Sequence, residues 1–384
     1  LLHRSQQVHH ANLSGYGKRR GIHPYKESFK VYDNKDGGKS RAKDEKHREY
    51  IDRPFHIIDD SKTFSVDSIE VEPVSVDHSL PGVCGFILHT SNGSIGYTAD
   101  IRFHGRRKGD SEKFVERCGN SDLSYLLCEG TRVSETYSKT EFEVEQDIKG
   151  VINRTRELII CNYPTRDLDR LLSFYNATLE SDRDLVIDTK QAYLLKLFQN
   201  SERWKNIYPK PDDKRIRIFT ARKSWGLIDR DGDVWTHDQI LQDYDKWERD
   251  FIDNYDNAVN YRDVASSQKD LIFYCNDYQL QNLIDVRPKA GSSYIRSLTE
   301  PFDEEMRLEE KRIIRWLVHF GFISKKGDWN QTHVSGHGDG NQIRKVVEET
   351  KSKAVVPIHT TKERYHRKWH KNVKGVKPDG ILIV

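Results

Sequence analysis

Four short stretches of this chain decide how it is interpreted: Asp77-His78-Ser79-Leu80-Pro81-Gly82, Tyr97-Thr98-Ala99-Asp100, His333-Val334-Ser335-Gly336-His337 and Val356-Pro357-Ile358-His359. Asp100 follows His78 by 22 positions, and His359 follows His337 by the same interval. Each interval has room for one supersecondary unit between two polar groups. Because His and Asp at the ends of apolar strands are what a carboxylate-bridged metal site requires, these stretches predict a metal centre.

Composition limits the classes of protein to which the chain can belong. Its 384 residues suffice for two ordinary domains or one large one, with 35% hydrophobic and 32% charged residues. The apolar runs are short, and none approaches the roughly 20 residues of a membrane-spanning helix. No signal peptide is visible either. We therefore expect a soluble cytoplasmic protein without membrane contacts, whose net charge of +3 permits an anionic substrate without demonstrating one.

The cysteine pattern agrees with an intracellular location. Five cysteines are scattered without C-x-x-C spacing, and most of them lie beside apolar residues. This pattern predicts buried free thiols in a reducing compartment. The chain starts with Leu1 and its single methionine is Met306, so we expect that its natural N-terminus is missing.

The first half of the chain has the sequence pattern of β-structure. Residues 1–50 are polar and rich in Lys, Arg and Gly, which predicts either a long surface excursion or a poorly ordered segment. Alternating apolar residues and Gly or Asn turns then predict successive strands, at 55–58, 62–66, 69–76, 85–89, 94–98 and 124–128. A short helix is expected at 112–118.

From about residue 150 the pattern alternates between strands and helices. Strands are predicted at 158–161, 185–188, 216–219 and 271–274, and helices at 166–179, 191–198, 237–259 and 303–320. This alternation is typical of a parallel sheet covered by helices. The last stretch returns to the first style, with strands at 331–334 and 354–358, and a helix at 339–350 whose start carries His337.

The quoted motifs and their order resemble the metallo-β-lactamase hydrolases of the β-CASP group, the RNase J-like nucleases. The resemblance implies an α/β protein, a metallo-β-lactamase αββα sandwich that is incomplete at its N-terminus and interrupted by a β-CASP α/β insertion domain. The expected parts are 1–150 and 326–384 for the sandwich, and 151–325 for the insertion. The chain lacks the family's first motif, H-x-H-x-D-H, and has Ala99 where the family usually has Gly.

The resemblance also implies roles for individual residues. Metal ligands would be His78, Asp100 and His359, with Asp100 bridging two zinc ions. Glu129, at the end of the run 126–128, would orient a catalytic histidine. That histidine, His337, would protonate the leaving oxygen as a general acid.

A second implied group would hold the substrate. His333, Ser335 and Gly336 would bind a substrate phosphate, and free N–H groups at a helix start favour such an anion. The implied activity is zinc-dependent hydrolysis of phosphodiesters, with two Zn²⁺ in a complete site and RNA as the partner. Single-stranded DNA is the alternative substrate, and the resemblance allows a homodimer.

A different class of function stays open. Because the chain has only three of the family's metal ligands, the protein could be a catalytically inactive paralogue that acts as a nucleic-acid-binding or assembly subunit. Paralogues of that kind lose ligands piecemeal, whereas every recognisable motif after residue 70 is intact here. This favours an active nuclease as the parent protein, with the present chain metal-poor and inactive by itself.

Overall fold

The computed structural model describes residues 30–33, 39–42, 58–60, 62–223, 243–301, 303–325 and 327–375. The chain divides into two compact units, Leu1–Asp59 and Asp60–Val384. In the first unit, β1 (Lys30–Asp33) pairs antiparallel with β2 (Lys39–Ala42). Most of the strand predicted at 55–58 and the first part of the helix predicted at 237–259 lie outside the described residues.

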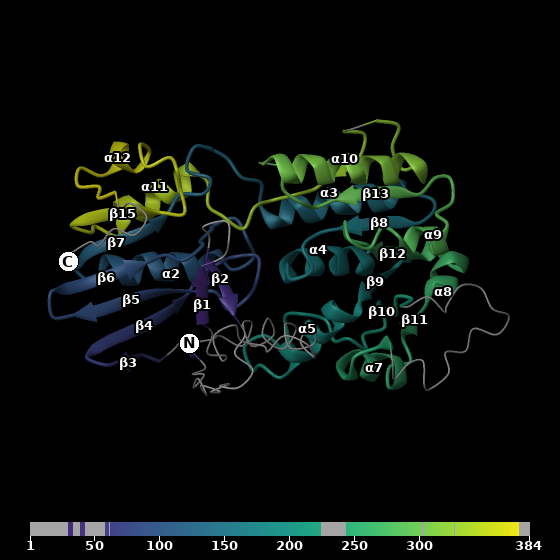
Figure 1. The fold of residues 1–384 in the computed structure, drawn as a ribbon, viewed down its shortest axis with the longest axis horizontal. Helices are drawn as coiled ribbons and strands as arrows, with labels where there is room; N and C mark the ends of the chain where they lie inside the picture. Colours follow the sequence, from purple (N-terminus) through teal and green to yellow (C-terminus); the bar gives the residue numbers. More distant parts are fainter. Residues whose placement is uncertain are drawn as a thin grey trace. The chain divides into compact units, whose positions relative to one another are not determined.

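The second unit contains a six-stranded mixed sheet in the order β15-β7-β6-β5-β4-β3 (Figure 1). Its strands are β3 (Phe64–Val66), β4 (Ile69–Ser75), β5 (Cys84–Thr90), β6 (Gly93–Tyr97), β7 (Leu123–Glu129) and β15 (Ala354–Ile358). Neighbours from β3 to β6 run antiparallel, whereas β6, β7 and β15 run parallel. All six strands were predicted from the sequence.

Two helices cover one face of this sheet. Helix α2 (Lys108–Gly119) contacts β4, and α11 (Gly340–Glu349) contacts β7 and α2. Their apolar side chains form one buried core with the strands, including Phe114 of α2, Ile343 of α11 and Leu126 of β7. A short helix, α12 (His366–Trp369), follows the last strand. This continuous core therefore fixes the positions of the carboxyl ends of β6, β7 and β15.

A seven-stranded sheet follows, in the order β11-β10-β9-β12-β8-β13-β14. All its strand pairs are parallel, as predicted. The strands are β8 (Ile159–Asn162), β9 (Asp184–Asp188), β10 (Ile216–Phe219), β11 (Ala258–Val259), β12 (Leu271–Tyr274), β13 (Ser293–Arg296) and β14 (Asn330–Gln331). The central strands are buried on both faces, which explains their continuous apolar runs.

The helices of this region are α3 (Glu141–Arg154), α4 (Leu168–Leu179), α5 (Thr189–Gln199), α7 (Lys246–Asp253), α8 (Tyr261–Ser266), α9 (Asn282–Val286) and α10 (Glu304–His319), with a 3-10 helix, η1, at Gln268–Asp270. Side chains of α8, α9 and α10 share one buried cluster with the strands. Helices α3, α4 and α5 contact strands of the same sheet. The predicted helices at 166–179, 191–198 and 303–320 correspond to α4, α5 and α10.

Three sequence-based expectations differ from the structure. The single helix predicted at 237–259 is wrong, because α7 ends at Asp253 and β11 follows it. Helix α3 was not predicted, although Thr140 and Glu143 form a capping box at its start. The strand predicted at 331–334 is shorter, since β14 ends at Gln331 and leaves His333 in a loop.

The fold is thus α/β, with one mixed and one parallel sheet. The chain leaves the six-stranded sheet after β7, builds the seven-stranded sheet, and returns to the first sheet with β15. All five cysteines are free and buried, as predicted. Among the described residues, no helix is long and apolar enough to cross a membrane.

Candidate metal centre

The predicted site residues lie at one edge of the six-stranded sheet. Strands β6, β7 and β15 are parallel, so their carboxyl ends meet at the same edge. Strand β4 is antiparallel to β5, which is antiparallel to β6, and its carboxyl end therefore joins them. His78, Asp100, Glu129 and His359 follow or end these four strands. The topology explains why residues far apart in the sequence share one place.

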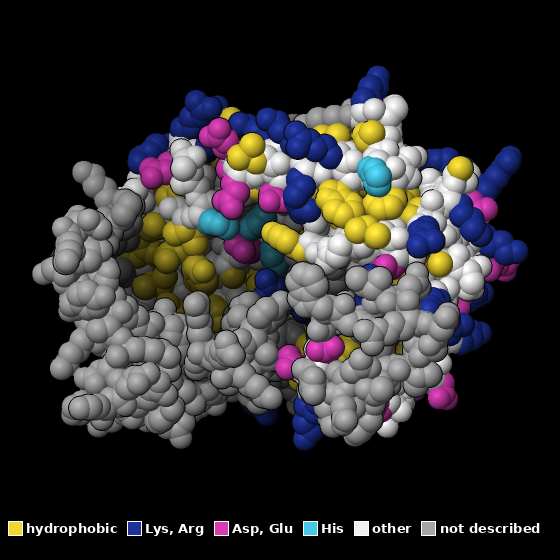
Figure 2. Space-filling view, turned by 45° about the vertical axis from the view of Figure 1, so that its right-hand side comes forward, with side chains coloured by type: hydrophobic (Ala, Val, Ile, Leu, Met, Phe, Trp, Pro, Cys, Tyr) yellow, Lys and Arg dark blue, Asp and Glu magenta, His cyan; other side chains and the backbone are white. Residues whose placement is uncertain are grey.

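Four of these side chains form one compact group. Asp100, Glu129, His337 and His359 each offer one ligand-type atom, and these atoms lie within 4.8 Å of one another. The Nδ1 atom of His359 is 3.3 Å from Asp100 Oδ1, and the Nδ1 atom of His337 is 3.9 Å from the same oxygen. Figure 2 shows His and acidic side chains gathered in a hollow of the face that it displays.

Within this group Glu129 orients His337. The Glu129 side chain is fully buried, and its Oε1 accepts a hydrogen bond from the backbone N–H of Ile101 at 2.7 Å. Its Oε2 accepts from Nδ1–H of His337 at 3.0 Å and from the N–H of Thr131 at 3.4 Å. Both carboxylate oxygens are therefore occupied, which fits the predicted orienting role better than a metal-ligand role.

The protonation of His337 follows from these neighbours. Burial opposes a charged imidazole, but the hydrogen bond to Glu129 and the charges of Glu129 and Asp100 raise the pKa of His337. Because Nδ1 donates to Glu129, the proton on Nε2 is the one available to a substrate. The pair thus has the chemistry of a general acid.

His78 lies beside this group. Its ring centroid is 5.4 Å from that of His337, and its Nδ1 is 2.7 Å from the Gly336 carbonyl oxygen. A carbonyl only accepts, so Nδ1 carries the proton and Nε2 keeps its lone pair. Burial lowers the pKa of His78, which keeps the ring neutral. A neutral imidazole that donates its other N–H to a backbone carbonyl is the usual state of a metal-ligating histidine.

The two remaining ligand candidates are accessible. The His359 side chain is 60% exposed and that of Asp100 is 41% exposed. Thr131 Oγ1 lies 3.1 Å from His359 Nδ1 and helps to fix that ring. Together with His78, these residues provide two imidazoles and one carboxylate, the donor set of a catalytic zinc ion. Among the described residues, the group whose ligand-type atoms lie close enough to hold one ion is Asp100, Glu129, His337 and His359, and His78 is not part of it.

The three predicted phosphate-binding residues, His333, Ser335 and Gly336, make different contacts. His333 Nδ1 donates to the Ser297 carbonyl oxygen at 3.3 Å, and burial lowers the pKa of His333 to about 3. Ser335 Oγ accepts from the N–H of His337 at 3.1 Å. A Cβ atom at Gly336 would lie 2.5 Å from Cε1 of His78, so the close approach that requires this glycine is to His78.

The expected helix start at His337 is wrong. Helix α11 begins at Gly340, and the side chain of Asp339 caps it by accepting from Asn341 and Gln342. The N–H groups of the helix start are therefore not at His337. The Ser335 carbonyl instead accepts two hydrogen bonds, from Arg102 Nη1 at 3.2 Å and His104 Nε2 at 2.8 Å.

Sequence reasoning did not find these two supporting residues. Arg102 follows Asp100 by two positions, and that proximity was the one available signal. Another missed residue is His366, which is fully buried and lies 3.3 Å through Nε2 from the Glu129 carbonyl oxygen. It lies in the basic run 362–371, and such a run is typical of a solvated surface.

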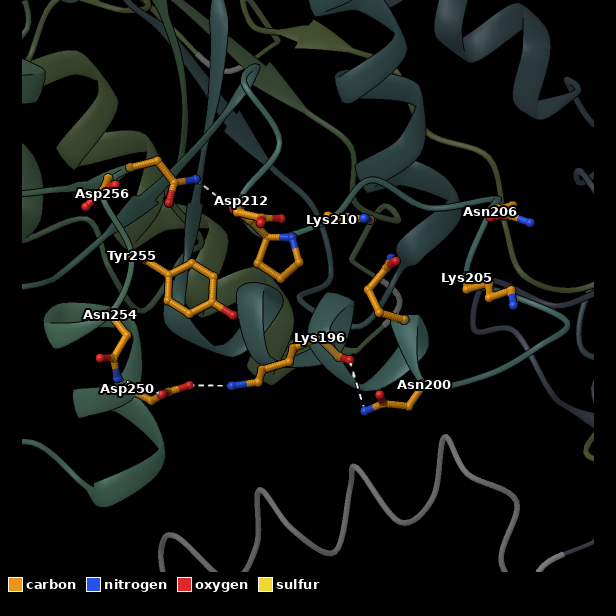
Figure 3. A pocket seen from close by; sticks show the side chains of 13 residues that line it. Lys196, Asn200, Lys205, Asn206, Lys210, Asp212, Asp250, Asn254, Tyr255 and Asp256 are labelled. Atoms are coloured by element: carbon orange, nitrogen blue, oxygen red, sulfur yellow. Dashed lines mark hydrogen bonds and ion pairs between the residues drawn. The ribbon is translucent and has the colours of Figure 1, made fainter.

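A separate cavity of about 1030 Å³ lies in the seven-stranded region (Figure 3). Residues of α5, of the loop before β10 and of the segment after α7 line it, and Lys196 pairs there with Asp250. None of the residues predicted for the site lines this cavity. It adds nothing to the chemistry at the strand ends.

Comparisons with known proteins give the fold alone. No protein-family model and no curated protein matches this chain. Among solved structures 84 chains match, including one described as "Crystal Structure of a Protein of Unknown Function from Enterococcus faecalis V583". That match has a TM-score of 0.60 and 18% sequence identity, and covers 87% of this chain and 68% of the other. The chain is thus similar in architecture to a protein of unknown function.

Proposed function

We propose that this chain carries the catalytic centre of a metal-dependent phosphodiester hydrolase that cleaves RNA. The observation that carries the proposal is the hydrogen-bonded pair of Glu129 and His337, which lies beside Asp100 and His359 at one strand edge. A buried carboxylate, an oriented imidazole and exposed ligand-type groups together suit hydrolysis better than binding alone.

The architecture supports assignment to the metallo-β-lactamase fold with a β-CASP insertion. The mixed sheet carries its ligand-type residues at carboxyl ends, and its last strand arrives only after the seven-stranded region is complete. That order is what the resemblance of the sequence motifs implies. The seven-stranded parallel region would be the insertion.

A metal ion would be held by His78, Asp100 and His359. These residues combine a neutral imidazole with a fixed tautomer, an accessible carboxylate and an accessible imidazole. A bound zinc ion supplies an activated water and stabilises charge on phosphate oxygens. Three protein ligands with an open coordination position are the composition of a catalytic zinc site. The proposal therefore departs from the expectation that this chain by itself is metal-poor and inactive.

His337 would act on the leaving group. Its Nδ1–H is committed to Glu129, so Nε2–H faces away from the carboxylate and can donate a proton. The hydrogen bond to Glu129 and the nearby carboxylate charges raise the pKa of His337, which favours its protonated form. Transfer of this proton to the leaving oxygen avoids release of an unstable alkoxide.

The loop before His337 would contact the substrate phosphate. Ser335 Oγ accepts from the His337 N–H and can donate its own O–H to a phosphate oxygen. Neutral His333 uses its single N–H on the Ser297 carbonyl, so it has no donor left for a phosphate. The choice of RNA over DNA rests on resemblance, because no described contact selects a 2′-hydroxyl.

The test combines metal binding and cleavage. The 384-residue chain is incubated with zinc or manganese and end-labelled single-stranded RNA, or DNA of the same sequence. We expect His337→Ala to lower the cleavage rate by roughly 10²–10⁴ while zinc binding persists. Asp100→Asn should weaken zinc binding as well, and His319→Ala, an exposed histidine on α10, serves as the control.

Each outcome of this experiment distinguishes the proposed RNA hydrolase from one of its alternatives. Cleavage of RNA that depends on His337 supports the proposal. Zinc and RNA binding without cleavage would make the chain a binding paralogue, and cleavage restricted to DNA would change the substrate. A wild-type chain that binds no zinc would refute the metal centre.

A further inference from the structure

A network of buried charges lies next to the candidate metal centre and connects it to the seven-stranded region. Arg102, which has no exposed surface, is its central residue. Its Nη2 is 2.6 Å from Oδ2 of Asp169 on α4, and its Nε is 3.3 Å from Oδ1 of Asp77. Asp77 immediately precedes His78. The guanidinium therefore joins a helix of the seven-stranded region to a segment of the metal centre.

Asp169 is shared by a second arginine. Its Oδ1 lies 2.5 Å from Nη1 of Arg107, and it also accepts from the Tyr208 hydroxyl at 3.2 Å. The Asp169 side chain is fully buried, and Arg107 is only 10% exposed. A buried guanidinium that loses its carboxylate is left with an uncompensated charge. Arg102 also pairs with Asp77 and, at 3.6 Å, with Glu141, and Arg107 lies 3.6 Å from Asp77, so Asp169 is the carboxylate with the shortest ion pair to each arginine but not the sole partner of either.

The other contacts of these arginines are with the backbone of the candidate centre. Arg107 Nη2 donates to the carbonyl oxygen of His78. Arg102 Nη1 donates to the carbonyl oxygen of Ser335 at 3.2 Å, two residues before His337. One carboxylate on α4 is therefore linked, through two arginines, to both segments that carry the centre's partly buried histidines, His78 and His337. In turn, the imidazole of His78 donates to Gly336, next to Ser335.

We infer that Asp169 is a positioning residue, through which docking of the seven-stranded region fixes His78 and His337. The inference concerns the geometry of the centre and rests on the proposed function for its consequence in metal binding. Loss of Asp169 would weaken the arginine contacts to the His78 carbonyl and the Ser335 carbonyl together, while His104 would still donate to the Ser335 carbonyl. The hydrogen bond from His78 to Gly336, which selects the tautomer with a free Nε2, would then be lost.

The test uses the full chain labelled with ¹⁵N-histidine, without added metal. Long-range ¹H–¹⁵N spectra report which ring nitrogen of His78 carries the proton, with His78→Ala providing the assignment. We expect the Nδ1–H form in the wild type, and in Asp169→Asn the averaged pattern of a solvent-exposed histidine. Zinc affinity, measured separately by chelator competition, should fall roughly 10-fold in the same variant.

The matched control is Glu145→Gln. Glu145 on α3 is also buried, pairs with Arg106 of the same loop, and has no contact to His78 or Ser335. It should leave the His78 spectrum unchanged. If Asp169→Asn does not fold, Tyr208→Phe removes one hydrogen bond from the same carboxylate and should shift the spectrum in the same direction, by less.

The inference would be overturned by a folded Asp169→Asn variant whose His78 signals match the wild type. It would also be overturned if Glu145→Gln changed these signals as much, because the effect would then be general loosening. A wild-type chain that shows the Nδ1–H form of His78 but binds no zinc refutes the proposed function and leaves the positioning role to be judged by the spectra.

Discussion

Replacing Glu129 with Gln removes the charge that orients His337 and changes little else in shape. The carboxylate is fully buried and accepts from His337 Nδ1 at 3.0 Å. In Glu129→Gln the amide oxygen can still accept from the N–H of Ile101, which places the NH₂ group against His337. A neutral His337 protonated on Nε2 would then be favoured, because its Nδ1 can accept from that NH₂ group.

The size of the effect follows from the pairing. A hydrogen bond to a charged group contributes about 1.5–3 kcal/mol, and about 1.4 kcal/mol corresponds to one pKa unit. We therefore expect the pKa of His337 to fall by about 1 to 2 in Glu129→Gln. A raised pKa in the folded state stabilises the protein below the unfolded value of 6.5, and this stability is lost as pH rises through the folded pKa. The stability difference between wild type and variant should thus be larger near pH 5.5 than near pH 9.

Two measurements check this prediction. A ¹⁵N-histidine titration gives the pKa of His337 in both proteins, and urea unfolding at the two pH values gives the stability difference. Glu309→Gln is the control, since Glu309 is half exposed and pairs with Arg312 on the same helix, α10. An unchanged pKa of His337, or a stability difference that does not depend on pH, would refute the role assigned to Glu129.

Three further substitutions test local features. Ala99 has a φ of +51°, so Ala99→Gly should remove about 1–2 kcal/mol of backbone strain. After the entropic cost of glycine, the free energy of unfolding in urea should rise by up to about 1 kcal/mol, and a decrease would contradict this. Gly336→Ala would place Cβ 2.5 Å from Cε1 of His78. This clash should lower the stability measured by thermal unfolding by about 1–3 kcal/mol and weaken zinc binding. An unchanged zinc affinity would show that the position of the His78 ring does not affect metal binding. Phe114→Ala, in the core beneath the six-stranded sheet, should cost about 3–5 kcal/mol, whereas exposed Phe142→Ala should change stability by less than about 0.5 kcal/mol.

Local sequence patterns determined most of the secondary structure. Apolar alternation and turns located the strands of the first sheet, and continuous apolar runs such as Ile159-Ile160-Cys161 located the buried parallel strands. These patterns work because burial on one or both faces imposes its own period on the residues. The same signal fails at 237–259, where charged and apolar residues have helical spacing but α7 ends at Asp253.

The sequence identified which types of residue belong to the candidate site, but not how their side chains contact one another. Polar residues at strand ends identified Asp100, Glu129 and His359, because strands that share an edge bring their ends together. Their contacts depend on pairing order, which is a property of the whole sheet. No local signal could show that Glu129 accepts from His337 across 208 residues.

Tertiary structure alone decided what supports the site. Gly336 is required by the ring of His78, 258 positions away in the sequence, and Asp169 reaches Arg102 across 67 positions. Such pairs have no periodic signature, since each partner merely looks polar or small in its own segment. Sequence determined which side chains are available at the strand ends, whereas packing of the two sheets determined which of them touch, because buried charges must find partners wherever the fold places them.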